Sequence, residues 1–354
     1  MRIEEFDYSL PDDFIAQQPL EDRDKSRLLV VKRKDGSVEH RIFNEIPQYM
    51  QNGDVLVINN TRVIPARLFG TKETGGKCEV LTLRQLSRSY IEDNIELSEW
   101  ECLIKASKHP KEGQKIFFNE CCQGKVINKR PNGKSVIRFQ TNENFEDTLN
   151  RIGKVPLPPY IKRNEKLRDF KGDLQRYQTV YAKKKGAIAA HTAGLHFTEG
   201  LISEIQKKGV KIVRITVHIG LGTFMPIRVK DIENHVLEAE YFEINREAAF
   251  LINEAVVGKR KIISVGTSTT RALESATYQD KSVKPMSGFT SLFIYNGYQF
   301  KIVDALVTNF HQPKSTPLLL VSAFGGKEII KDTYKRAIKE KYRFLSYGDG
   351  MLIL

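Results

Sequence analysis

The chain alternates between two kinds of sequence, and this alternation limits the folds open to it more than any other feature. A compact apolar strand, Asp54-Val-Leu-Val-Ile-Asn-Asn-Thr, ends the first part, and apolar blocks with strand–helix texture resume after Pro156. Between them lie short alternating stretches divided by turn signals such as Pro131-Asn-Gly, a strong hairpin signal. Such spacing favours a small barrel. We therefore predict an α/β fold in which a main α/β domain carries an inserted small all-β barrel domain. The predicted boundaries divide the chain into residues 1–62, 63–153 and 154–354.

The charge balance points to a class of partner. Among 354 residues, 56 Lys and Arg outnumber 43 Asp and Glu, which gives a net charge of +13 and a pI near 9.4. Basic side chains that neutralise phosphates release counterions, so this excess favours a polyanionic partner. A generic basic soluble protein is the alternative. No apolar run approaches the roughly 18 residues of a transmembrane helix, and we expect no membrane association.

The four cysteines carry little information about chemistry. Cys78, Cys102, Cys121 and Cys122 lack C-x-x-C spacing, and an adjacent Cys121–Cys122 pair is a poor zinc clamp or disulfide. Free thiols fit a reducing cytosol. We therefore predict a cytoplasmic protein without a structural metal.

One segment, residues 176–198, combines small and polar residues in an unusual way. It passes from aromatic residues through Gly186-Ala-Ile-Ala-Ala to a polar cluster that includes Thr192, Gly194 and His196. Small residues beside glycine allow a backbone to come close to a ligand. A tightly packed strand–turn–helix junction is the alternative interpretation.

Polar residues also follow two predicted strands. The strand at 211–220 places His218 on its polar face and is followed by Gly220-Leu-Gly222. That motif lacks the third glycine of a dinucleotide site, and Pro226 stands where the phosphate-binding helix would run. The strand at 260–266 leads into Thr267-Ser-Thr-Thr, where hydroxyls can cap a helix start and backbone N–H groups can bind an anion.

A third strand is predicted within residues 298–313, ending in Thr308, Asn309 and His311. Ligands of open α/β sheets bind beyond the carboxyl ends of the strands. We therefore expect His218, the 267–270 hydroxyls and His311 to converge there. Each histidine taken singly also fits a structural role, and capping alone would explain the hydroxyls.

Ten motifs, spread from the first residues to the last and in the same order, resemble the S-adenosylmethionine:tRNA ribosyltransferase-isomerase family. The motifs are Asp7-Tyr-x-Leu-Pro, Ile15-Ala-Gln-x-Pro, Arg23-Asp-x-Ser-Arg-Leu-Leu-Val, Asn59-Asn-Thr-Arg-Val-Ile-Pro-Ala-Arg-Leu, Leu157-Pro-Pro-Tyr-Ile, Arg176-Tyr-Gln-Thr-Val-Tyr-Ala, Thr192-Ala-Gly-Leu-His-Phe-Thr, Gly222-Thr-Phe-x-Pro, Val303-Asp-x-Leu-x-Thr-Asn-Phe-His and Tyr342-Arg-Phe-x-Ser-Tyr-Gly-Asp.

The resemblance implies an α/β domain with an inserted β-barrel and an unusual use of S-adenosylmethionine. The ribosyl unit, not the methyl group, is transferred to 7-aminomethyl-7-deazaguanine at the wobble position of tRNA. The product is epoxyqueuosine, and adenine and methionine are released. S-adenosylmethionine is then a consumed co-substrate, tRNA is the partner, and we expect a monomer.

The implied chemistry selects candidate residues. The sulfonium acidifies the C5′ hydrogens, so a histidine base of near-neutral pKa is useful, and loss of adenine needs proton donation or charge stabilisation. The candidate catalytic residues, unranked, are His196, His218, His311 and Asp304. The S-adenosylmethionine-binding candidates are Thr192, Gly222, Thr267, Ser268, Thr269 and Arg271, the last as a counter-charge for the methionine carboxylate. The RNA-binding candidates are Arg62, Arg67, Tyr160, Arg163, Tyr342 and Arg343, because aromatic stacking with basic flanks is the usual way to hold an unstacked base.

The chain departs from the family pattern at several positions. His191 stands where the pattern has proline, and Glu238 stands where it has a second histidine. The 266–271 segment GTSTTR varies on the expected string, and Asn296 replaces a proline. Because proline exchanges no proton, we predict that His191 is not catalytic.

Two alternative functions come from other classes of protein. One is a tRNA methyltransferase, which would yield S-adenosylhomocysteine, and the other is a non-catalytic RNA-binding module.

Overall fold

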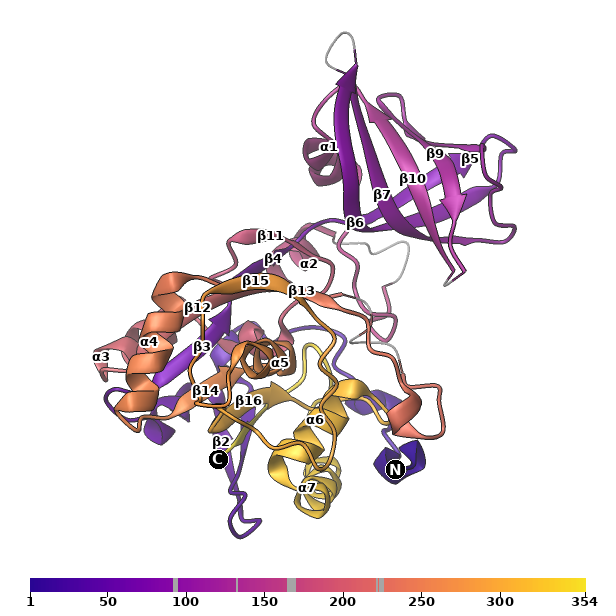
Figure 1. Ribbon diagram of the computed structural model, residues 1–354. Coiled ribbons are helices and arrows are strands. Elements are labelled where there is room, and N and C mark those ends of the chain that lie inside the picture. Colours follow the sequence, from indigo (N-terminus) through magenta and orange to yellow (C-terminus); the bar gives the residue numbers. More distant parts are fainter. Residues whose placement is uncertain (92–94, 132, 164–169, 221, 223–225) are drawn as a thin grey trace. The chain divides into compact units, whose positions relative to one another are not determined.

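The structure is a computed structural model that describes residues 1–91, 95–131, 133–163, 170–220, 222 and 226–354. Its internal contacts divide the chain into two compact units (Figure 1). The first unit comprises Met1–Arg62, Pro158–Leu167 and Arg176–Leu354, and the second comprises Val63–Leu157 and Arg168–Gln175. Separate folding of residues 63–153 stays a prediction.

A mixed nine-stranded sheet forms the centre of the first unit, so the predicted α/β class is confirmed (Figure 1). Its strand order is β15-β13-β12-β3-β14-β16-β17-β1-β2. The neighbours β12, β3, β14 and β16 are parallel, so their carboxyl ends lie along one edge of the sheet. The strands are β1 (Arg27–Val31), β2 (Val38–Ile42), β3 (Val55–Asn59), β12 (Lys211–His218), β13 (Glu240–Ile244), β14 (Ile262–Val265), β15 (Met286–Thr290), β16 (Ala305–Asn309) and β17 (Gly350–Ile353).

Helices cover both faces of this sheet, which explains the continuous apolar run around residue 55. Val55 and Val57 of β3 pack into a core with α4, α5, α6 and α7, while Leu56 and Ile58 pack into a second core with α3. A strand buried on both faces reads as an uninterrupted apolar block. The helices are α3 (Glu199–Lys207), α4 (Arg246–Val257), α5 (Thr267–Ala276), α6 (Thr316–Gly325) and α7 (Lys327–Lys339), with 3₁₀ turns at Ile3–Phe6, Asp12–Phe14, Arg23–Lys25, Phe43–Tyr49, Thr192–His196 and Ile232–Asn234. A two-stranded sheet joins β4 (Thr61–Val63) and β11 (Lys184–Ala187).

Six strands of the second unit form a closed barrel in the order β10-β7-β6-β5-β8-β9. The unit is not all-β as predicted, because a helix, α1, places Phe145 in the barrel's core against Trp100. The hairpin predicted at Pro131-Asn-Gly joins β9 to β10, with residue 132 outside the described residues. The elements are β5 (Arg67–Lys72), β6 (Lys77–Ile91), β7 (Ile95–Ala106), β8 (Lys115–Asn119), β9 (Cys122–Lys129), β10 (Lys134–Thr141) and α1 (Phe145–Ile152), followed by α2 (Phe170–Arg176).

Two strand predictions have different outcomes. The strand at 211–220 is confirmed as β12, with Val213, Ile215 and Val217 in one core. The strand predicted from residue 298 is wrong over its first half. There the Glu274 carboxylate accepts the backbone N–H groups of residues 301, 302 and 303 at 2.8, 3.2 and 3.1 Å, which removes these donors from sheet pairing.

No helix in the described part of the chain is both long enough and apolar enough to cross a membrane. All four cysteines are free thiols.

Candidate active site

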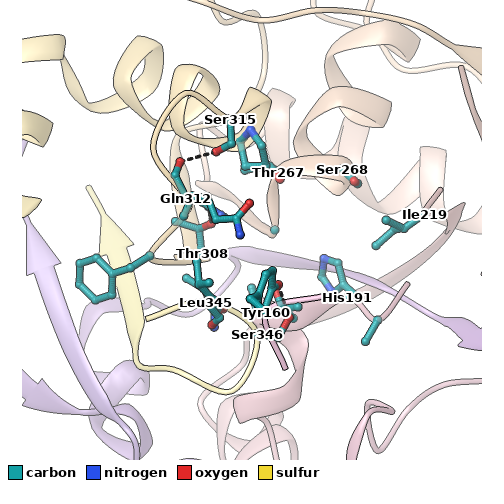
Figure 2. Close-up of a pocket in the computed structure, with 18 residues that line it drawn as sticks. Tyr160, His191, Ile219, Thr267, Ser268, Thr308, Gln312, Ser315, Leu345 and Ser346 are labelled. Carbon is teal, nitrogen blue, oxygen red and sulfur yellow. Dashed lines mark hydrogen bonds between the residues drawn. The ribbon is translucent and has the colours of Figure 1, made fainter. Parts of the chain in front are cut away.

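A pocket in the first unit lies where β12, β14 and β16 end, as expected for a ligand site of an open sheet. Its empty volume is about 600 Å³, including space open to solvent. Figure 2 shows that the side chains around it come from segments far apart in the sequence. The lining residues are Tyr160, Ala190, His191, Thr192, Ala193, Ile219, Gly266, Thr267, Ser268, Thr308, Asn309, Phe310, His311, Gln312, Ser315, Pro317, Leu345 and Ser346.

The turn from β14 to α5 forms one wall of the pocket. Gly266 has φ of +83°, and a Cβ there would lie 2.1 Å from His191 Nε2, so both conformation and space require glycine. Behind the turn, the Thr270 hydroxyl donates to Ser264 Oγ at 2.9 Å. Thr267 and Ser268 line the pocket in the first turn of α5, where backbone N–H groups lack helical partners and can receive an anion. This turn therefore brings two of the predicted S-adenosylmethionine-binding residues, Thr267 and Ser268, into the pocket.

His311 lies in the wall that follows β16. Its Nε2 lies 2.8 Å from Thr308 Oγ1, and its backbone N–H donates to the Tyr334 hydroxyl at 3.0 Å. The Tyr8 hydroxyl donates to its carbonyl oxygen. Burial lowers the pKa of His311 to about 3, so the imidazole is neutral at pH 7 and has a proton-accepting nitrogen.

The pocket also holds polar groups that no sequence argument singled out for the small-molecule site. Asn309 donates its amide N–H to the Leu345 carbonyl at 2.9 Å, and its side chain interacts with the His196 ring. Tyr160, predicted to bind RNA, lies 2.8 Å from Ser346 Oγ through its hydroxyl and lines this pocket. The motif at Tyr342–Asp349 contains Ser346, but the motif alone did not indicate that Ser346 lines this pocket.

His191 faces the pocket, although the prediction assigns it no proton transfer. Its side chain is buried, with Nε2 3.2 Å from Thr269 Oγ1 and with Nδ1 lacking a partner among the described residues. Burial lowers the pKa of His191 to about 4. Thr269, a predicted ligand, contacts His191 and does not line the pocket; Thr192 does.

His196 lies beside this pocket, in a smaller neighbouring one that shares Ser346 with it. Its Nδ1 lies 2.7 Å from Ser26 Oγ, and its ring stacks on Phe43 with centroids 4.6 Å apart. Burial lowers the pKa of His196 to about 4, against a smaller opposite effect of the Asn309 side chain. The pKa values of His196 and His311 are thus lower than the near-neutral value expected of the base, because both rings are desolvated.

Three other candidates lie outside the pocket. His218 lies 2.8 Å from Thr61 Oγ1 through Nδ1 and stacks on Tyr241. Asp304 is exposed at the opposite end of β16, where its carboxylate accepts the Ile262 N–H at 2.8 Å. Gly222 is next to exposed Glu238, and a Cβ there would lie 3.4 Å from Glu238 Cβ. The expectation that Asp304 acts as an acid is wrong, because that aspartate precedes the strand whose far end carries the site.

Arg271 is also not a pocket residue. Its Nη1 forms a buried ion pair with Glu240 Oε2 at 2.8 Å, and its Nε donates to the Leu292 carbonyl at 2.8 Å. The side chain is therefore committed to joining α5 to β13. Its predicted role as counter-charge for a carboxylate is corrected to a structural one.

The predicted RNA-binding residues are dispersed. Tyr342 is fully buried, with its hydroxyl 2.7 Å from His40 Nδ1 and its ring under the Arg27 guanidinium, so it cannot stack on a base. The remaining positions are exposed Arg62 on β4, Arg67 paired with Glu79 at 3.1 Å in the barrel unit, Arg163 donating to the Gln17 carbonyl at 2.9 Å, and Arg343 donating to the Gln18 carbonyl.

Within the described residues, no group of three or more His, Cys, Asp or Glu side chains is placed to hold a metal ion. The polar groups of the pocket are instead hydroxyls, amides and neutral imidazoles. Such groups recognise an organic ligand by hydrogen bonds.

Comparison with known proteins gives full-length matches. The model of the family described as queuosine biosynthesis protein matches residues 3–353. S-adenosylmethionine:tRNA ribosyltransferase-isomerases are 47% identical in Natranaerobius thermophilus, 48% in Caldanaerobacter subterraneus and 48% in Staphylococcus haemolyticus. Each match covers 100% of this chain and 99 to 100% of the relative.

A solved structure agrees with these sequence matches. The crystal structure of S-adenosylmethionine tRNA ribosyltransferase from Thermotoga maritima is 34% identical, covers 99% of this chain and 100% of its own, and superposes with a TM-score of 0.55. The chain therefore belongs to the S-adenosylmethionine:tRNA ribosyltransferase-isomerase family of enzymes.

Proposed function

We propose that this enzyme transfers and isomerises the ribosyl moiety of S-adenosylmethionine onto 7-aminomethyl-7-deazaguanine at the tRNA wobble position, giving epoxyqueuosine-tRNA, adenine and methionine. The observation that carries the proposal is the polar pocket at the carboxyl ends of β12, β14 and β16 in a chain of this family. The net charge of +13 supports a tRNA substrate.

The pocket's groups suit the parts of S-adenosylmethionine. The first turn of α5, with Thr267 and Ser268, offers N–H and hydroxyl donors to the methionine carboxylate. Asn309 lines the pocket, and its Oδ1 is an acceptor suited to an amino group of the methionine or adenine part.

We propose that the general base is His196 or His311. Both are neutral at pH 7 and can accept a proton, and the sulfonium acidifies the C5′ hydrogens that the base must reach. Their low pKa values make them weak bases in the free enzyme, so the cationic sulfonium must promote proton loss from the substrate itself. Thr192 and Tyr160 complete the proposed binding site.

The decisive experiment is chromatography of the small-molecule products after incubation with S-adenosylmethionine and tRNA carrying 7-aminomethyl-7-deazaguanine. We expect adenine and methionine to appear together, in step with loss of the free aminomethyl group. S-adenosylhomocysteine as the main product would instead identify a methyltransferase, and unconsumed S-adenosylmethionine would identify a non-catalytic binding module.

We further propose that the enzyme works as a cytoplasmic monomer without a metal. Sedimentation of the protein at several concentrations tests whether it is a monomer, and a mass that rises with concentration would contradict this. Activity in the presence of a strong chelator tests whether a metal is needed, and a loss of activity would contradict a metal-free enzyme.

A further inference from the structure

Residues from three of the motifs that carry the family resemblance meet at the second pocket of the first unit. Arg23 and Ser26 belong to the motif that begins at Arg23, and Arg176 begins the next of the three motifs. The motif that begins at Tyr342 contributes residues 346–348. The empty volume is about 310 Å³, including open space. The described residues that line it are Pro19, Leu20, Arg23, Ser26, Arg176, Leu195, His196, Ser346, Tyr347 and Gly348.

The charged groups of this pocket are cationic. Arg23 Nη1 donates to the Gln178 carbonyl at 2.6 Å, and Arg176 Nη1 donates to the Glu21 carbonyl at 3.0 Å. Carbonyl oxygens orient a guanidinium without neutralising it. Burial lowers the pKa of Arg23, and the neighbouring charge of Arg176 lowers it further, so the two cations repel each other. The described lining residues include no Asp or Glu.

One buried polar atom at this pocket is Arg176 Nε, which has no hydrogen-bond partner among the described residues. Buried polar atoms are normally paired, so this donor points to a ligand that carries acceptor oxygens.

We propose that this second pocket binds one phosphodiester group of the tRNA, next to the nucleotide whose base enters the first pocket. The proposal rests on the proposed function, which supplies tRNA as the substrate. Guanidinium groups match phosphate oxygens in geometry and charge, and phosphate contacts fix the register of a nucleic acid on its protein. The two pockets share Ser346, so a phosphate held in one places the adjoining nucleotide beside the other.

The methionine carboxylate of S-adenosylmethionine is the alternative anion for this pocket. The test below distinguishes binding of the tRNA phosphodiester from binding of this carboxylate. Arg176→Gln removes one proposed phosphate contact, Arg176→Lys keeps the charge, and Arg246→Gln removes an exposed positive charge at the start of α4 as the matched control. For each variant, tRNA binding is measured by fluorescence anisotropy over a range of salt, and S-adenosylmethionine binding by calorimetry.

We expect Arg176→Gln to weaken tRNA binding about five- to tenfold at low salt and to reduce the salt slope of log K by about 1. S-adenosylmethionine affinity should stay within about twofold, Arg176→Lys should restore most of the slope, and Arg246→Gln should match the wild type. A wild-type slope in Arg176→Gln, or an equal loss of S-adenosylmethionine affinity, would overturn the proposal.

A second measurement needs no variant and covers the case in which Arg176→Gln does not fold. Inorganic phosphate should displace tRNA from the wild-type enzyme more effectively than chloride at equal ionic strength, and equal displacement would overturn the subsite. Failure of the wild type to release adenine and methionine would refute the proposed reaction instead, and the binding data would still decide the subsite.

Discussion

At the scale of single residues, His191 lies in the pocket although we predict that it takes no part in proton transfer. It lines the pocket, and its Nε2 lies 3.2 Å from Thr269 Oγ1, yet the family pattern has proline there. Its φ of −75° is within the range that a proline ring imposes. The backbone at this position is therefore compatible with the family residue.

We predict that His191→Pro folds and keeps kcat/KM within about threefold, and that it stabilises the fold by about 0.4–1 kcal/mol by restricting the unfolded chain. His196→Ala is the comparison, with a loss of at least about a hundredfold if His196 is the base. Steady-state kinetics and urea unfolding measure both. A folded His191→Pro enzyme that loses tenfold or more in kcat/KM would show that this chain uses the extra imidazole.

The buried histidines also predict how stability depends on pH. Burial lowers the pKa values of His191 and His196 to about 4 and that of His311 to about 3, whereas an unfolded histidine titrates near 6.5. The unfolded chain thus takes up protons that the folded chain refuses, so stability is complete above pH 6.5 and falls as the pH drops toward 4.

At pH 5 each of these three histidines should cost on the order of 2 kcal/mol of unfolding free energy relative to pH 7. Urea unfolding at pH 7, 6 and 5 measures this loss in a window above the usual titration range of carboxylates. An unfolding free energy that is unchanged or rises from pH 7 to pH 5 would contradict the desolvated environment of these rings.

At the scale of secondary-structure elements, the Arg271–Glu240 ion pair joins α5 to β13. The pair is 2.8 Å long, and both side chains are almost fully buried. Glu240 Oε1 also accepts the Gly220 N–H at 3.3 Å, so the pair connects the helix whose first turn lines the pocket to the loop that follows β12. Its effect on the site is to hold these elements in place.

Arg271→Ala should destabilise the fold by about 3–5 kcal/mol, because it leaves the Glu240 carboxylate buried without its counter-charge. Urea unfolding measures the loss, and the double variant Arg271→Ala with Glu240→Gln should recover part of it, since the remaining group is neutral. Normal unfolding behaviour together with a selective loss of S-adenosylmethionine affinity would restore the carboxylate-binding role that the sequence suggested.

At the scale of the whole molecule, the division into two units is the feature with the clearest experimental consequence. The barrel is closed by its own strand pairing, and its core of residues such as Trp100, Phe139 and Phe145 comes from residues of the second unit. A unit that buries its own core can fold separately.

Limited proteolysis should therefore cut first near the borders of residues 63–153 or within Ser87–Ser98, of which residues 92–94 lie outside the described part. The described residues of that stretch pair between strands β6 and β7, up to Ile91 and Ile95. Early cleavage within 211–222 or 303–311, which include β12 and β16 of the main sheet, would contradict the separation. Mass spectrometry of the first fragments distinguishes these outcomes.

The sequence by itself determined the features that depend on local pattern. Continuous apolar runs specify strands buried on both faces, as in β3. A helix does begin at Thr267 as expected, but its N-cap is Gly266 and no side chain caps it, so the predicted capping by hydroxyls is wrong. The motifs from Asp7 to Asp349 were enough to assign the family, because long ordered strings are specific without any knowledge of contacts.

Only the tertiary structure decided which polar residues meet. Asp304 and His311 are close in sequence but lie at opposite ends of β16, because the strand separates them along its length. Arg271 forms an ion pair with Glu240 and does not line the pocket, because its position on α5 directs its side chain toward β13. Tyr342 and Ser346 belong to one motif, yet the Tyr342 side chain is buried in the core and Ser346 lines the pocket, because their side chains point in different directions in the folded chain. A sequence records which groups are present, but distances between groups far apart in the chain arise only when the sheet assembles.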